Sequence, residues 1–292
     1  MSYYIHTLQF PFTNTVLNFK ELTCEQCHSL IKINNIFPAS SENRSEYHIQ
    51  LVNILKDCIK EKDNIYNLNI LEFLMFCIRL RSLSISANVE LEAGKKNDQN
   101  VKININFYDL MANVFESTNI IQNYKNIKLD DIELSLCWPL LNHEIFFLNS
   151  IEDDQFNKFI NSIPLFVDNI VIKNKTFDFK NLNFEQKKEL IDSLPISIQN
   201  ILQTNILSLL KELSEMTLFG LEDFNQYKLE FYNATIQDII RFLFAGSEDS
   251  EIAEVCFLKK FNFDMNEIYN MTPRQKNNYI NYLIQSAKEQ ST

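Results

Sequence analysis

The stretch Leu68–Phe107 reads LNILEFLMFCIRLRSLSISANVELEAGKKNDQNVKININF and decides the fold of the first part of the chain. Between residues 70 and 80 nearly every side chain is apolar, interrupted only by Glu72 and Arg79. A helix that is apolar on almost all sides belongs inside a fold, with other elements packed around it. This run of eleven residues is too short for a membrane-spanning helix, which needs about 20. We therefore predict a buried helix here.

A β-hairpin is predicted directly after this helix, because the apolar period changes to two residues. Apolar and polar residues alternate over 85–92 and again over 101–107, and the polar run 94–100 lies between them. Pairing of these two strands would bring Glu90 and Glu92 near Lys102. The whole stretch is core architecture, and nothing in it resembles a nucleophile or a metal cage.

Length and composition are those of a globular protein with a large core. The chain has 292 residues, of which 46% are hydrophobic and 22% charged, and this length suits two domains. Three glycines are too few for a phosphate loop, a dinucleotide-binding fingerprint or a glycine-rich linker. A formal charge of −11 argues against a nucleic-acid binder, which needs clustered Lys and Arg to release counterions.

The start of the chain lacks the features of an export signal. Met1–Tyr4 supplies neither the basic segment nor the apolar core of a secretory signal, and no run reaches transmembrane length. We therefore expect cytoplasmic synthesis, no membrane span, and reduced cysteines that are mostly buried as small apolar groups. The six cysteines are Cys24, Cys27, Cys58, Cys77, Cys137 and Cys256.

The remaining patterns divide the chain into an α+β domain over 1–141, built of hairpins around the buried helix, and a mainly helical domain over 142–292. The other elements expected in the first domain are a hairpin over 4–19, helices over 24–34 and 45–60, and a hairpin over 127–136. Those expected in the second are a hairpin over 170–179 and helices over 153–163, 184–193, 196–216, 235–245 and 273–289. The stretch 108–115 fits either a helix or a strand.

Helix ends carry more specific signals. Thr23 and Gln26 have the spacing of a capping box at a helix start. Thr272 followed by Pro273 places a capping hydroxyl before a proline at the first helical position. Gly246 is placed to cap the C-terminus of the helix that precedes it.

The sharpest candidate site is Cys24-Glu-Gln-Cys27-His28, which has the spacing of a c-type haem attachment motif. That chemistry requires export and a distal iron ligand, and the motif lies in the first turns of a predicted capped helix. Zinc binding by Cys24 and Cys27 with His28 or His48 is the alternative, but no second pair completes a tetrahedral site. We interpret both cysteines as structural and expect neither a metal nor a cofactor.

Paired acids and histidines do not form a catalytic set. Asp130-Asp131 stands where a hairpin needs turn residues, and Glu152-Asp153-Asp154 stands where a helix start favours negative charge. General acid–base catalysis needs opposed, differently solvated groups in a cleft, and this glycine-poor chain lacks a nucleophile turn. The four histidines are scattered, at His6, His28, His48 and His143. We therefore predict no catalytic residues and a protein that acts through structure or interaction.

Two helices of the second domain carry wide apolar faces. The face of the 196–216 helix contains Ile198, Ile201, Leu202, Leu209, Leu210 and Leu213. The last helix adds Tyr279, Tyr282 and Leu283. Such faces belong either to a surface that binds another protein or to the core of a helix bundle, and both alternatives stay open.

The order of features between Leu8 and Pro139 matches a known pattern. In sequence these features are the hairpin Leu8–Phe19, Leu22-Thr23 at a helix start, a helix Asn53–Cys58 ending near a cysteine, the buried helix Leu68–Leu80, Arg81-Ser-Leu-Ser84-Ile85 entering Val89–Glu92, and Ile132–Pro139. This order resembles the T4-type bacteriophage baseplate hub protein family. Lys20-Glu21 departs from the Arg-Pro that members often have, and Ser86-Ala87 from the common Gly-Glu.

The resemblance implies a non-enzymatic component of the baseplate hub of a contractile tail, or a factor that assembles the hub, with other hub or tail proteins as partners. It supplies no enzymatic residues. The alternative is a tail assembly chaperone that binds apolar segments of another tail protein, such as the tape measure, and is absent from the mature virion. Either protein would work in the host cytoplasm during assembly, and a hub component would stay in the tail baseplate of the virion.

Overall fold

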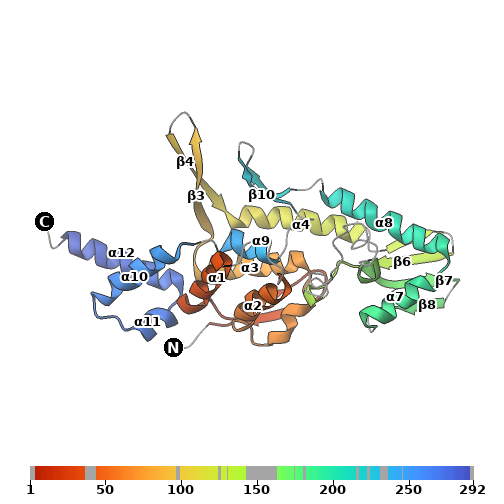
Figure 1. Cartoon of the computed structure of the whole chain (residues 1–292), viewed down its shortest axis with the longest axis horizontal. Helices are drawn as coiled ribbons and strands as arrows, with labels where there is room; N and C mark the ends of the chain where they lie inside the picture. The colour runs from red at the N-terminus through yellow and green to blue at the C-terminus, as the bar shows by residue number, and fades with distance from the viewer. Residues whose placement is uncertain are drawn as a thin grey trace. The chain divides into compact units, whose positions relative to one another are not determined.

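Helices and short antiparallel sheets alternate along the chain in the computed structural model (Figure 1). The structure describes residues 4–36, 44–96, 99–123, 126–129, 131–142, 163–173, 175–179, 182–214, 217–221, 224–230, 236–244 and 246–289. An α+β protein with a mainly helical C-terminal part is thereby confirmed.

Two compact units make up the chain. Unit 1 contains residues 1–65, 72–109 and 235–292, and unit 2 contains residues 66–71 and 110–234. This division does not coincide with the expected boundary at residue 141, because the last helices group with the N-terminal residues. Strands from both sides of residue 141 also share one sheet of unit 2.

Unit 1 begins with a hairpin and two helices. Strands β1 (His6–Gln9) and β2 (Val16–Phe19) pair antiparallel, as predicted. Helices α1 (Cys24–Ile36) and α2 (Arg44–Lys56) follow. Before α1, the Gln26 amide donates to Thr23 Oγ1 at 3.2 Å and the Thr23 amide donates to Gln26 Oε1 at 3.0 Å, which confirms the predicted capping box.

Helix α3 (Ile70–Ser84) is the predicted buried helix, and Phe73, Leu74 and Phe76 have no exposed surface. Glu72 is also fully buried. Its Oε1 accepts hydrogen bonds from the amides of Phe12 and Thr13, at 2.9 and 3.0 Å, in the turn between β1 and β2. A buried carboxylate needs such donors, so Glu72 ties the first hairpin to α3.

Strands β3 (Asn88–Lys96) and β4 (Gln99–Asn106) form the predicted hairpin, with Glu92 opposite Lys102. Helix α4 (Phe107–Asn123) follows and settles the stretch that fitted either a helix or a strand. Its start has a local cause, because Asn106 Oδ1 accepts a hydrogen bond from the Tyr108 amide at 2.8 Å, as an N-cap side chain does.

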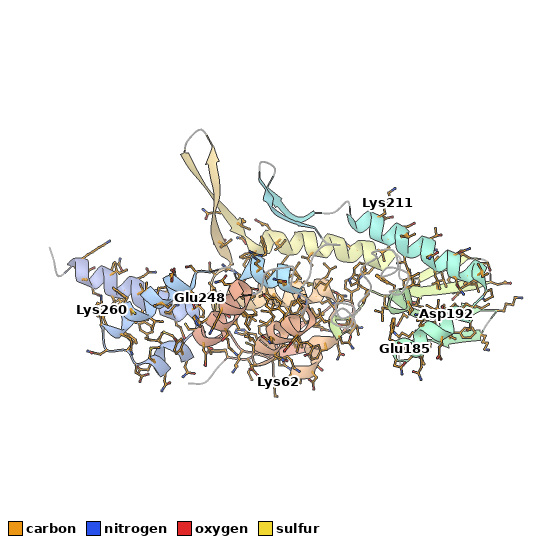
Figure 2. All side chains as sticks on the ribbon, in the orientation of Figure 1. Lys62, Glu185, Asp192, Lys211, Glu248 and Lys260 are labelled. Carbon is orange, nitrogen blue, oxygen red and sulfur yellow. The ribbon has the colours of Figure 1, made fainter. Side chains whose placement is uncertain are left out.

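Unit 2 is built on a four-stranded antiparallel sheet in the order β5-β6-β7-β8. The strands are β5 (Asn126–Leu129), β6 (Ile132–Leu136), β7 (Val167–Ile172) and β8 (Lys175–Asp178). Both predicted hairpins are confirmed, and β6–β7 pairing joins them into one sheet. Helices α7 (Phe184–Asp192) and α8 (Ile196–Ser214) share a hydrophobic core with this sheet, and their charged residues Asp192 and Lys211 are exposed (Figure 2).

Several short elements were not predicted, among them the 3-10 helices η1 (Lys62–Asn67) and η2 (Ile163–Phe166) and the hairpin of β9 (Thr217–Leu221) and β10 (Phe224–Glu230). The helix expected over 153–163 lies outside the described residues, except Ile163, which begins η2. None of the helices that the structure describes is both long and apolar enough to cross a membrane.

Four helices of unit 1 close the chain: α9 (Ile236–Leu243), α10 (Glu248–Lys259), α11 (Met265–Asn270) and α12 (Pro273–Glu289). Thr272 and Gln275 form a capping box before α12, with Pro273 at the first helical position as predicted. Gly246 does not adopt the left-handed conformation of a C-cap glycine. A Cβ at this position would lie 2.6 Å from Ile31 Cδ1, so a larger residue would require the Ile31 side chain of α1 to shift.

Candidate functional site

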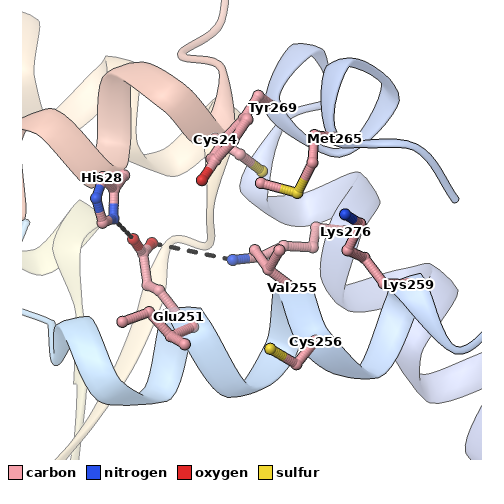
Figure 3. A pocket seen from close by; sticks show the side chains of 10 residues that line it. Cys24, His28, Glu251, Val255, Cys256, Lys259, Met265, Tyr269 and Lys276 are labelled. Carbon is pink, nitrogen blue, oxygen red and sulfur yellow. Dashed lines mark hydrogen bonds and ion pairs between the residues drawn. The ribbon is translucent and has the colours of Figure 1, made fainter.

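The Cys24-x-x-Cys27-His28 motif forms the start of α1, and its side chains do not converge. Both cysteines are buried, and burial raises the pKa of Cys24 to about 11 and that of Cys27 to about 12. Metal binding and thioether chemistry need a thiolate, so protonated thiols suit a packing role. The contact of His28 is with another helix instead, since its Nδ1 lies 2.7 Å from Oε2 of Glu251 on α10 (Figure 3).

The other sequence candidates also lie apart. His48 is buried in α2, and His6 Nε2 lies 3.4 Å from Glu21 Oε1. Asp131 is exposed in the β5–β6 turn, where its carbonyl accepts from the Lys173 amide at 3.1 Å. Asp130, His143 and Glu152–Asp154 lie outside the described residues. Within the described residues, no three His, Cys, Asp or Glu side chains come together as a metal site requires.

A charge cluster that sequence patterns did not reveal joins α1, α10 and α12. Lys276 of α12 is buried, and its Nζ lies 2.7 Å from Glu254 Oε2 and 3.9 Å from Glu251 Oε1. Burial by itself lowers the pKa of Lys276, but the hydrogen bond and charge of Glu254, with the charges of Cys24 and Glu251, outweigh burial and raise that pKa. Lys276 is therefore a charged anchor. Its one sequence signal is the spacing of the two glutamates, which share one face of α10.

A cavity of about 310 Å³ opens beside this cluster, and all its lining residues belong to unit 1 (Figure 3). Its apolar wall includes Ile252, Val255, Cys256 and Met265. Its polar end is formed by His28, Glu251 and Lys276, which already bind one another. Because these three groups bind one another, the apolar part of the cavity suits an apolar group such as one side chain.

Exposed apolar side chains gather on α12. Tyr279 is 47% exposed, Tyr282 is 67% exposed and Ile284 is 41% exposed. An open groove of about 460 Å³ lies along this helix, lined by Gln275, Asn278, Tyr279 and Tyr282. We call these four residues the α12 outer face.

The expected apolar face of α8 lies in the core of unit 2. Ile198, Leu202 and Leu209 are buried, and Ile201 packs against the same hydrophobic cluster. The side chains of Leu210 and Leu213 lie outside the described residues. Of the two alternatives left open for α8, the core is therefore correct for these residues, and its exposed apolar side chains are Ile196 and Leu207 instead.

The residues that carry the family resemblance meet at the C-terminal end of α3. Ser84 Oγ accepts a hydrogen bond from the Leu22 amide at 2.8 Å and donates to the Leu80 carbonyl at 2.7 Å. Cys58, after α2, contributes its carbonyl to the amide of Lys20 at 2.8 Å. The shared pattern therefore fixes how α1, α2 and α3 pack.

We call these contacts at the C-terminal end of α3 the α3 junction. The buried side chain of Arg81 also belongs to it. Its Nε donates to the Leu243 carbonyl at the end of α9 at 2.5 Å, and its Nη1 donates to the Ser86 carbonyl. The guanidinium also lies over the Phe107 ring, 4.7 Å from the centroid. Burial lowers the pKa of Arg81 to about 10. Carbonyl groups at a helix C-terminus stabilise a cation, so Arg81 binds α3, α9 and the start of β3 together.

The sequence of this chain matches a known protein family. Residues 1–224 match the family described as T4 bacteriophage base plate protein, which is the greater part of the chain. The chain belongs to this family of base plate proteins. No curated protein and no solved structure matches it.

In this base plate protein the matched region does not coincide with a structural unit. Leu22, Cys58, Arg81 and Ser84 all lie inside the matched residues. Helices α9 to α12 lie beyond residue 224, yet they complete unit 1 and carry most of the cavity and the whole α12 outer face. The most exposed apolar surface of unit 1's helices is therefore a feature outside the family match.

Proposed function

We propose that this base plate protein is a non-enzymatic component of the base plate hub, or a factor that assembles the hub, and acts through contacts with other hub or tail proteins. The observation that carries the proposal is the α3 junction. Leu22, Arg81 and Ser84, which make the sequence resemble hub proteins, hold the fold together by hydrogen bonds. The residues that carry the resemblance therefore have structural contacts in this chain.

The chemistry of unit 1 agrees with a role in binding. The thiols of Cys24 and Cys27 stay protonated at neutral pH, and Glu251 and Glu254 are engaged by His28 and Lys276. These groups are used to fix helices. The exposed aromatic side chains of α12 and the cavity remain as the features that suit protein contact.

The test is mass spectrometry of purified virions beside infected-cell lysate. A fixed copy number in virions is the result expected of a hub component, and recovery with hub intermediates from lysate is the result expected of a hub assembly factor. We place the protein in the host cytoplasm during assembly and, as a hub component, in the virion tail. Normal base plates in the absence of the protein would overturn the proposal.

A second candidate function is a tail assembly chaperone that binds apolar segments of another tail protein, such as the tape measure. The cavity favours it, because an apolar wall and a volume of about 310 Å³ suit one large side chain of such a segment. Val255→Trp would fill the cavity, and Ile196→Trp on the exposed start of α8 is the matched control. Loss of tape-measure binding in Val255→Trp alone, with the protein absent from virions, would favour the chaperone.

A further inference from the structure

The last three helices of unit 1 bury few apolar side chains. We call residues 246–289, which contain α10, α11 and α12, the C-terminal arm. All residues of this arm are described, and each of its helices buries one apolar residue: Leu258 in α10, Ile268 in α11 and Pro273 in α12. Helix α9 has only 8 residues, yet it buries four apolar side chains. Apolar burial is the main source of local stability, so the arm is held less firmly than α9.

Polar groups make much of the contact between the arm and the rest of unit 1. The three helices of the arm pack on α1. There Glu251 Oε2 lies 2.7 Å from His28 Nδ1, and the Cys24 amide donates to the Met271 carbonyl at 2.8 Å. Arg274 donates to carbonyl groups at and just after the C-terminal end of α3. Water can replace each of these partners, so the net stabilisation from such contacts is modest.

Two cavities lie between the arm and the helices on which it packs. The cavity of about 310 Å³ separates Cys24 and His28 of α1 from α10 and α11 (Figure 3). A second cavity of about 200 Å³ has Cys27 and Arg81 on one side and residues of α10 and α12 on the other. Protein interiors are normally close-packed, and atoms that line a void lack dispersion contacts. The boundary of the arm is therefore a weakly packed layer.

The arm has the connections of a body that moves as a whole. Residues 246–247, which join it to α9, are exposed and belong to neither helix. Helix α9 has its own anchor, because Arg81 donates to the Leu243 carbonyl at 2.5 Å. Within the arm, α12 is tied to α10, since Lys276 Nζ lies 2.7 Å from Glu254 Oε2. Movement at residues 246–247 would thus leave both α9 and the inside of the arm intact.

We propose that the C-terminal arm opens as one body about residues 246–247 while the rest of unit 1 stays folded. The contact of His28 with Glu251 is the latch that keeps the arm closed. Opening breaks this contact and uncovers the first turn of α1, including the buried Cys24. The device belongs to unit 1 by itself, so it goes beyond the proposed role in the base plate and does not depend on which tail protein the chain contacts.

The experiment is hydrogen exchange of the full-length protein, followed by mass spectrometry of its peptides at neutral pH. Amides of α10, α11 and α12 exchange at least about a hundredfold faster than those of α3, through one shared opening. Glu251→Ala speeds exchange in all three helices by the same factor, about tenfold, because the latch is lost. His28→Ala, on the other side of the latch, has the same effect on the arm. Asp249→Ala is the matched control, because Asp249 is an exposed carboxylate in the same turn of α10, and it leaves the arm unchanged.

A variant in the core separates opening of the arm from unfolding of unit 1. Ile78 of α3 is 1% exposed, and Ile78→Val speeds exchange in α3 about two- to tenfold while the arm keeps its rate. An equal increase in α3 and in the arm would show that unit 1 opens only as a whole and would overturn the proposal. So would arm amides that exchange as slowly as those of α3.

Two further results contradict the proposal. If Glu251→Ala speeds exchange in α10 alone, the three helices fray separately and the arm is not one body. If Glu251→Ala and Asp249→Ala have the same effect, the contact with His28 is not the latch. Circular dichroism spectra equal to that of the wild type show that each variant is folded before its exchange is compared.

Discussion

Helices α8 and α12 both carry wide apolar faces, yet they use them in opposite ways. On α8 the side chains of Ile198 and Leu202 are buried against the sheet of unit 2. On α12 only Pro273 and Lys276 are buried, and Tyr279 and Tyr282 remain exposed. The width of an apolar face did not decide its use. A sheet has an apolar face that needs a cover, and α8 packs over the sheet of unit 2, whereas α12 packs on the helices α1 and α10.

The two helices are also held by different forces. Apolar packing holds α8, whereas the ion pair of Lys276 and Glu254 anchors α12 in a unit that contains the buried thiols Cys24, Cys27, Cys58 and Cys77. Unit 2 has only the half-buried Cys137, but it carries the single tryptophan of the chain. Trp138 packs edge-on against Phe166, with 5.2 Å between the ring centroids. Tryptophan fluorescence therefore reports on unit 2 alone.

Alkaline pH has the largest expected effect, because it lowers the unfolding free energy of unit 1 much more than that of unit 2. Burial raises the pKa of Cys24 to about 11, those of Cys27 and Cys58 to about 12, and that of Cys77 well above the ordinary 9.0. The stability that unit 1 gains from keeping these thiols protonated is fully present below pH 9. It is lost as the pH rises from 9 through the pKa values of the folded state, because the thiols of the unfolded chain ionise first. At pH 10 each of these thiols costs about 1–2 kcal/mol, so the four together cost several kcal/mol.

Urea unfolding at pH 8 and pH 10 measures this effect. We expect the helices of unit 1, followed by circular dichroism, to unfold at a lower urea concentration at pH 10 than at pH 8. The Trp138 transition, followed by fluorescence, keeps its midpoint. Cys58→Ala, as a control, removes about one quarter of the pH effect. An equal shift of both transitions would show that the units unfold together and would break the comparison.

Leu202→Ala tests the buried face of α8. Leu202 has no exposed surface, and truncating a buried leucine costs about 2–5 kcal/mol through lost packing and a residual cavity. Leu207 on the same helix is 51% exposed, so Leu207→Ala changes stability by less than about 0.5 kcal/mol. The Trp138 transition in urea provides the measurement. Similar losses for the two variants would contradict the burial of only one face.

Glu254→Gln tests the anchor of α12. The substitution leaves the buried Lys276 ammonium without its closest carboxylate, and because Glu254 is itself about one third exposed, the cost is about 1–2 kcal/mol. Asp57→Asn breaks the exposed ion pair with Lys62, 2.6 Å apart, and costs less than about 0.5 kcal/mol. Urea unfolding followed by circular dichroism compares them. Equal small losses would mean that the Lys276 pair does not hold α12.

Tyr282→Ala has the smallest expected effect on folding. The side chain is two thirds exposed, so the substitution changes the unfolding free energy by less than about 0.5 kcal/mol. Urea unfolding followed by circular dichroism provides the measurement. A loss above about 1 kcal/mol would show that Tyr282 supports the fold of unit 1, and α12 would then resemble α8 after all.

Local signals allowed accurate prediction from the sequence. The capping box of Thr23 with Gln26 and the helix start at Thr272-Pro273 each involve residues at most three positions apart, and the structure has both. The buried α3 and the β3–β4 hairpin follow from periodicity within one stretch. In each case the residues that determine the element are also the residues that form it.

Long-range contacts could not be predicted in this way. Arg81 binds the carbonyl of a residue 162 positions away, and His28 contacts Glu251 across 223 positions. Sequence reasoning placed Arg81 at the end of a helix and His28 in a possible metal motif, because the partners of both are set only by folding. The same limit explains the boundary expected at residue 141, since nothing local shows that α9 to α12 return to unit 1.

The hydrogen bond from Arg81 to Leu243 has a consequence for synthesis of the protein. The ribosome makes the first half of unit 1, then the residues of unit 2 from 110 to 234, and only then the helix that Arg81 binds. At about 5–20 residues per second, those roughly 125 residues take about 6–25 s. During this interval the surfaces of α1 and α2 on which α9 later packs stay uncovered, and Arg81 has not yet met its partner at Leu243. Unit 1 can therefore close only after the whole of unit 2 has been made.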